Sequence, residues 1–68
     1  MINEYAIFAS RFSIPADVVY TLPAVFERCA QIAKMPLRAF VSEATYSNQP
    51  LGEYIKTVAI KVAKEDAG

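Results

Sequence analysis

The sequence is poor in the residues on which catalytic and metal sites usually depend. Its 68 residues include no histidine, no tryptophan, one cysteine and two glycines. Cys29 cannot form a disulfide within the chain, and there is no imidazole to serve as its general base or as a metal ligand. Two glycines cannot supply a glycine-rich phosphate loop. We therefore expect no enzymatic activity, no catalytic or metal site and no cofactor, with Cys29 as a small buried hydrophobic residue.

Neither sign of charge is in excess. Seven basic and seven acidic residues give a formal net charge of zero, so the chain lacks the general surplus of cations that favours non-specific binding of nucleic acid. The cations are nevertheless clustered, because residues 54–64 contain Lys56, Lys61 and Lys64 and no acid.

Long apolar runs are also missing. None approaches the roughly 18 to 20 residues of a membrane span, and the start MINEYAIF has no basic region typical of a signal peptide. We expect a cytoplasmic protein with no membrane partner.

The length of the chain predicts a single domain, residues 1–68, that buries too little surface on folding to be more than marginally stable. A domain of about 60 residues buries only about 60% of the surface of its unfolded chain. Small domains often depend on disulfides, metals or partner chains, and composition argues against the first two. Because 54% of the residues are hydrophobic and eight are aromatic, we expect a homodimer in which part of this apolar surface is buried.

Four prolines, at positions 15, 23, 36 and 50, divide the chain. Proline is best tolerated in the first turn of a helix, so the last three are predicted to begin helices. We expect helices at 2–12, 23–34, 36–44 and 50–64. The stretch PADVVYT, residues 15–21, is compatible with one or two helical turns, which would form a fifth helix, and with an extended link. The predicted fold class is all-α: a small bundle of four or five short helices joined by tight, proline-marked turns.

Apolar residues recur within these segments at spacings of three and four, which predicts the faces turned to the core. Ile60 lies opposite the apolar stripe of the last segment, where it is either a lone exposed side chain or a contact with a second chain. The predicted inward residues are, by segment, Ile2, Tyr5, Ala6, Ala9 and Phe12; Val25, Phe26, Cys29, Ile32 and Ala33; Leu37, Phe40, Val41 and Ala44; and Leu51, Tyr54, Ile55, Val58 and Val62.

Residues 37–55, LRAFVSEATYSNQPLGEYI, resemble the first two helices of a phage-repressor-type helix-turn-helix domain. The match consists of Leu37-Arg38, the apolar pair Phe40 and Val41, a small residue at Ala44, the pair Tyr46-Ser47, Leu51-Gly52 and Ile55. The resemblance implies an all-α DNA-binding protein. The sequence departs from the family at Lys56, where a glycine is usual, so we expect residues 51–64 to form one continuous helix without a separate recognition helix.

A second resemblance is to ribbon-helix-helix proteins. VVYTLP would be the short strand and PLRAFVSEA the second helix of that family, although the connection KM is shorter than the loop that the family uses.

Two functions follow from these patterns. The first is a small dimeric DNA-binding regulator of transcription, in which double-stranded DNA is bound through its phosphates and base edges. The second is a protein-interaction module such as an antitoxin, inhibitor or adaptor, which works through an apolar surface and binds no DNA. The predicted DNA contacts are Arg38, Lys56, Lys61 and Lys64 to phosphates and Asn48, Gln49 and Thr57 to bases or backbone. The predicted interface residues are Ile60, Tyr54 and Phe8.

Overall fold

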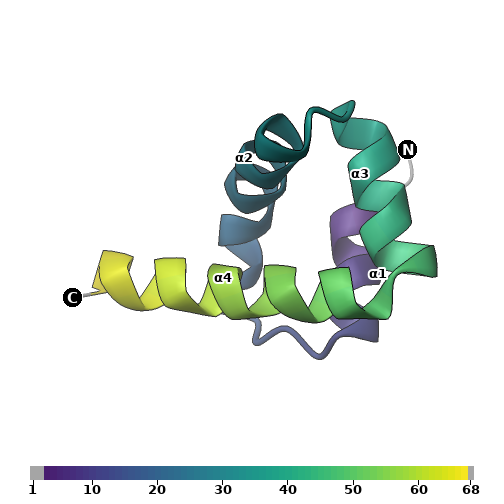
Figure 1. The fold of residues 1–68 in the computed structure, drawn as a ribbon. Coiled ribbons are helices and arrows are strands. Elements are labelled where there is room, and N and C mark those ends of the chain that lie inside the picture. Colours follow the sequence, from purple (N-terminus) through teal and green to yellow (C-terminus); the bar gives the residue numbers. More distant parts are fainter. Residues whose placement is uncertain (1–2, 68) are drawn as a thin grey trace.

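In the computed structural model, which describes residues 3–67, the chain folds into four α-helices and two short helical turns, with no strand in that range (Figure 1). α2 and α3 diverge from a tight corner, α4 crosses below both of them, and α1 packs behind α3 (Figure 1). The all-α prediction is confirmed. The elements in order are α1 (Glu4–Arg11), the 3₁₀ turn η1 (Val19–Thr21), α2 (Leu22–Ala33), α3 (Leu37–Ser42), the π-helical turn η2 (Glu43–Ser47) and α4 (Gln49–Ala67).

The helical alternative for residues 15–21 is confirmed in its shorter form, because the stretch contains one 3₁₀ turn and no extended link. It forms a turn that leads into η1, in which the Thr21 hydroxyl donates a 2.7 Å hydrogen bond to the Val18 carbonyl. The strand on which the ribbon-helix-helix resemblance depends is therefore not formed, because residues 18–23 coil into η1 and the start of α2.

Local signals in the sequence account for the helix boundaries. Pro23 and Pro50 lie in the first turns of α2 and α4, and Pro36 directly precedes α3. Asn3 caps α1, since its side-chain oxygen accepts the Ala6 N–H at 3.2 Å. The predicted proline-marked starts are thus present in the structure.

The end of α2 is formed by a residue with left-handed backbone. Lys34 has φ 58° and ψ 42°, and its N–H donates to the carbonyls at the end of the helix. This conformation reverses the chain within three residues, so α2 and α3 meet at a sharp corner.

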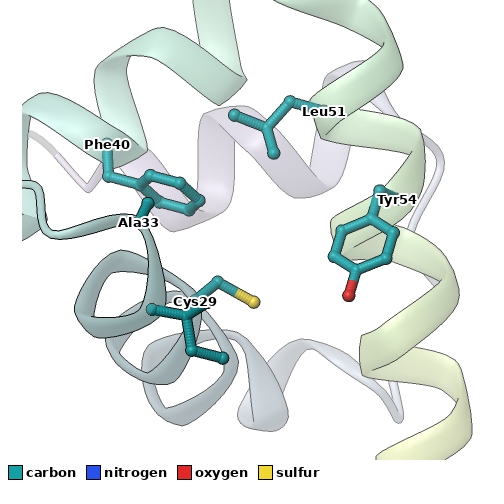
Figure 2. A pocket seen from close by; sticks show the side chains of 6 residues that line it. Cys29, Ala33, Phe40, Leu51 and Tyr54 are labelled. Carbon is teal, nitrogen blue, oxygen red and sulfur yellow. The ribbon is translucent and has the colours of Figure 1, made fainter.

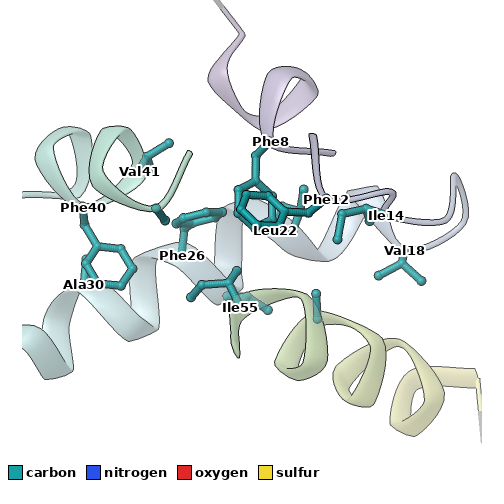
Figure 3. Close-up of a cluster of buried hydrophobic side chains, with 13 residues drawn as sticks. Phe8, Phe12, Ile14, Val18, Leu22, Phe26, Ala30, Phe40, Val41 and Ile55 are labelled. Atoms are coloured by element: carbon teal, nitrogen blue, oxygen red, sulfur yellow. The ribbon is translucent and has the colours of Figure 1, made fainter. Parts of the chain in front are cut away.

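The core is built around a chain of aromatic rings from three helices (Figure 3). Phe8 of α1 meets Phe26 of α2 edge-on, with ring centroids 5.0 Å apart, and Phe26 meets Phe40 of α3 at 6.0 Å. Edge-to-face pairs are favourable beyond their burial of area. The buried apolar residues are Phe8, Phe12, Ile14, Val18, Leu22, Val25, Phe26, Ala30, Phe40, Val41, Ala44, Ile55 and Ala59.

The turn η2 is tied to α1 by a charged side chain. The Arg11 guanidinium donates to the carbonyl of Thr45, which is fully buried, and lies 4.9 Å from the centroid of the Phe12 ring. Within the described residues the Thr45 hydroxyl has no hydrogen-bond partner. The π-helical turn at residues 43–47 thus accepts, through the Thr45 carbonyl, the hydrogen bond that joins it to the end of α1.

α4 packs on the core through one large residue, Ile55, and two small ones, Gly52 and Ala59. Gly52, Ile55 and Ala59 are buried, while Tyr54 is 59% exposed and Leu51 is half-buried. The predicted stripe is confirmed at Ile55, while Tyr54, predicted inward, is mostly exposed. Glycine and alanine let the helix axis approach the core closely at Gly52 and Ala59, which leaves Tyr54 on the flank. Val58 and Val62, also predicted inward, are half-buried.

Phe8 was predicted at an interface, and this is wrong because the side chain is fully buried. Phe8 and Phe12 are four residues apart and stack at 4.6 Å, so α1 turns its aromatic side inward and leaves Ala6 exposed. Burying an aromatic ring removes far more apolar surface from water than burying an alanine. Ile2, also predicted to face inward, lies outside the described residues.

Three further predictions of side-chain environment need correction. Ile32 and Leu37 were expected in the core, but they are 69% and 37% exposed. Ile60 was expected on the outer side of its helix, but it is half-buried and packs against the edge of the core. None of the helices in the described part of the chain combines the length and apolar character needed to cross a membrane.

Candidate apolar interaction groove

The residues predicted to contact DNA are distributed over separate parts of the fold. Arg38 is exposed in the first turn of α3, and the other six run from Asn48 to Lys64 at the start of α4 and along it. At 1.5 Å per residue this stretch is about 24 Å long. The start of α3 and the C-terminal end of α4 lie on opposite sides of the molecule (Figure 1). The structure therefore does not gather these seven side chains into one cluster.

Two of these residues make hydrogen bonds that support α4 itself. The side-chain oxygen of Asn48 accepts the Leu51 N–H at 3.0 Å and so caps the helix. The Thr57 hydroxyl donates to the Glu53 carbonyl at 3.1 Å, one turn earlier. Gln49, Lys61 and Lys64 are exposed and Lys56 is half-buried.

α4 runs without interruption through Lys56, from Gln49 to Ala67. The prediction of one continuous helix is confirmed. No helix break follows Lys56 that would begin a separate recognition helix.

An apolar groove lies between α2, α3 and the start of α4 (Figure 2). Cys29 and Ala33 of α2 and Phe40 of α3 lie across from Leu51 and Tyr54 of α4 (Figure 2). The cavity has a volume of about 200 Å³. The groove is defined by six lining residues, Cys29, Ile32, Ala33, Phe40, Leu51 and Tyr54.

The groove is bordered by large apolar side chains that water reaches. Ile32 and Tyr54 are 69% and 59% exposed, and Met35 and Leu37 at the neighbouring corner are 38% and 37% exposed. Scattered exposed apolar residues are ordinary, but several of them around one cavity are typical of an interaction site.

The chemistry of the lining is almost entirely apolar. Burial raises the pKa of the Cys29 thiol above its ordinary value of 9.0, so the thiol is protonated at neutral pH and a weak nucleophile. The remaining polar atom is the Tyr54 hydroxyl. The described residues contain no group of three or more potential metal ligands. The arrangement can bury an apolar side chain, and it offers no set of groups for acid–base catalysis.

The size of the cavity limits what it can hold. Small-molecule sites usually enclose about 300–1,000 Å³, which is more than this groove provides. A single large apolar side chain fits the volume better than a cofactor does.

The sequence pattern placed Tyr54 on the inward side of its helix and also named it as an interface residue, and it placed Cys29 and Ile32 on the inward stripe of α2. Cys29 does pack against the core, whereas Ile32 does not. One signal could have indicated this: Ala30, outside the predicted stripe, and Ile32 are both apolar but lie on nearly opposite sides of the helix, so a single packed face could not cover both. The structure buries Ala30 and leaves Ile32 at the groove.

A basic stretch of the sequence surrounds the α2–α3 corner, at residues that the periodic pattern did not single out as a group. Residues 28–42 carry Arg28, Lys34 and Arg38 and no acid, and all three side chains are exposed around the α2–α3 corner.

Comparison with protein-family models, with curated proteins and with solved structures found no match.

Proposed function

We propose that this chain is a helical protein-interaction module that acts through the apolar groove. The observation that carries the proposal is the exposure of Ile32 and Tyr54, 69% and 59%, on the two walls of one cavity. Fully burying a large aliphatic side chain contributes roughly 1.5–3 kcal/mol, so a partner that covers these two residues gains a substantial driving force. Tyrosine is also enriched among the residues that dominate binding energy at protein interfaces.

A protein partner fits the groove better than a charged ligand. The lining presents one thiol and one phenol as its polar groups and no cation, so a phosphate or carboxylate would lose its hydration without a charged partner. An apolar side chain carries no charge whose hydration would be lost on binding.

Photo-crosslinking tests this proposal. Tyr54 is replaced by a photoreactive phenylalanine analogue, and the cells that produce the protein are irradiated and analysed by mass spectrometry. We expect a discrete protein adduct. The matched control places the same analogue at Tyr46, which is 53% exposed and lies outside the groove, and it should give no such adduct. Equal labelling from both positions, or no adduct from position 54, would contradict the proposal.

DNA binding is a second candidate function, favoured by the basic α2–α3 corner. α2 and α3 are joined by three residues, and helix-turn-helix motifs use a turn of three to four residues. In such motifs the second helix enters the groove of DNA with its N-terminal residues, and Arg38 lies in that part of α3, where its side chain would reach a phosphate. This assignment makes α3, and not the segment after Lys56, the helix that would enter the groove of DNA.

Duplex binding measured at several salt concentrations tests this second candidate. Affinity for a mixed-sequence duplex should fall steeply with salt, and Arg38→Ala should reduce the slope of log K against log salt by about 1 if the side chain contacts a phosphate. No retardation of any duplex at low salt would remove DNA binding from consideration.

A further inference from the structure

We infer that the occupant of the apolar groove is a second copy of this chain, bound about a two-fold axis with Ile32 of each copy in the cavity of the other. The inference rests on the proposed function, because it names the partner of the same groove.

The first argument is self-complementary shape. A two-fold interface brings the same patch of both subunits together, so that patch must contain both a projection and a cavity that receives it. Ile32 is the most exposed of the large apolar residues, at 69%, and it borders a cavity of about 200 Å³. The same face of the protein thus carries the projecting side chain and the cavity that would receive it from the other copy.

The second argument is charge. The chain has no net charge, so two copies do not repel each other as whole molecules. Arg28 precedes Ile32 by one helical turn, and Glu43 follows Phe40 by three residues, so helical spacing puts one cation and one acid near groove residues. Lys34 and Arg38 are also exposed, beside Met35 and Leu37 at the α2–α3 corner. The two-fold arrangement therefore places this basic corner against the acids of the other copy and not against its own equivalent.

Glu27, the acid next to Arg28 in the sequence, lies on a different side of α2 from the groove. Burial and, next, the Glu27 carboxylate raise the pKa of Tyr5 in α1, so Glu27 lies on the α1 side of α2. The groove side of that helix is left with the cation.

The third argument is area. Ile32, Met35, Leu37 and Tyr54 together expose about 400 Å² per chain, if a large side chain presents roughly 200 Å² when fully exposed. Two copies bury about 800 Å² from these side chains alone, and the groove lining and its border bring the total near the ~1,000 Å² of a small specific interface. This total lies at the lower limit for a specific interface, so we expect a weak dimer that forms at high protein concentration.

The test is the weight-average mass by sedimentation velocity across a concentration series from about 1 to 500 μM. The wild-type mass should rise from 7.5 kDa toward twice that value. Ile32→Glu should weaken association roughly thirtyfold or more, because a carboxylate would enter an apolar cavity. The side chain is 69% exposed, so the substitution leaves the fold intact, as circular dichroism can verify. The matched control is Ile7→Glu in α1, which makes the same change at a 38% exposed position outside the groove and should dimerise like the wild type.

Alkylation of Cys29 provides a second readout on the unmodified chain. The thiol lines the groove, so its alkylation rate should fall as the wild-type concentration rises and should stay constant for Ile32→Glu.

The outcomes separate this inference from the proposed function. A wild-type chain that stays at 7.5 kDa at the highest concentration, or an Ile32→Glu variant that dimerises normally, overturns the second-copy inference. In either case an adduct of a different protein at position 54 would still support the interaction module. A monomeric chain that also gives no adduct would remove both.

Discussion

Replacing Gly52 by alanine provides the sharpest test of how α4 is placed on the core. A Cβ atom at this position would lie 2.1 Å from the Cζ atom of Phe12 and 2.5 and 2.6 Å from its two Cε atoms. Carbon atoms in contact are normally about 3.5–4.0 Å apart, so the ring or the helix would have to move by roughly 1.5 Å.

The Phe12 ring has little freedom to make room. It is 4% exposed, stacks on Phe8 at a centroid distance of 4.6 Å, and is covered by the Arg11 guanidinium at 4.9 Å. Arg11 is itself held by its hydrogen bond to the Thr45 carbonyl. A shift of the ring would therefore disturb contacts to both α1 and η2.

Two effects of opposite sign decide the result. Alanine in a helix interior is about 1 kcal/mol more favourable than glycine. Overpacking a core typically costs about 1–3 kcal/mol, and a displacement of this size belongs at or beyond the upper end. We expect the free energy of unfolding to fall by about 2 kcal/mol, which for a domain of this length lowers Tm by roughly 8–16 °C.

Urea denaturation followed by circular dichroism measures this change. Phe12→Leu shortens the opposing side chain, so the double variant should lose at least about 1 kcal/mol less than the sum of the two single variants. A Gly52→Ala variant that is more stable than the wild type, or strict additivity in the cycle, would refute the close approach of α4 to Phe12.

Three further predictions concern single residues. Lys34→Gly should raise the free energy of unfolding by about 1 kcal/mol in urea denaturation, because glycine adopts a φ of 58° without the steric cost that a Cβ imposes; an unchanged midpoint would contradict this. Asn48→Ala should lower it by about 1 kcal/mol through loss of the cap on α4, whereas Asn48→Asp should retain most of the stability. Burial raises the pKa of the Cys29 thiol above 9.0, so on raising the pH the unfolded chain loses this proton before the folded chain does. The free energy of unfolding should therefore fall as the pH rises through and above 9.0, and Cys29→Ala should reduce this fall. Identical pH profiles of the two proteins would argue against a buried thiol.

Helix boundaries were largely predictable because their causes are local. Pro23 and Pro50 can occupy the first turn of a helix but not its interior, and Asn48 caps the helix that follows it. These effects involve neighbours within four residues, so no knowledge of the fold is needed to anticipate them. The stretch 15–21 was less certain because its β-branched residues suit both a helical turn and an extended link, and only its packing selects η1.

The buried faces were predicted less well, and for this reason Ile32 and Tyr54, which line the groove, were predicted to face the core. Hydrophobic spacing favours the largest apolar residues of α4, such as Tyr54, as the inward ones. The close approach of the helix to Phe12 instead requires the small side of α4, at Gly52 and Ala59. A periodic pattern records which side chains are apolar, but not how near a neighbouring helix comes.

The sequence alone determined that this is a small all-α protein and where most of its helices begin, because prolines and capping residues act on their near neighbours. The tertiary structure decided which apolar residues remain exposed. α4 packs along the line of Gly52, Ile55 and Ala59, and α2 has more apolar surface than its neighbours cover. Ile32 and Tyr54 are therefore left on the walls of one groove, at a position set by contacts between residues more than twenty apart in the sequence.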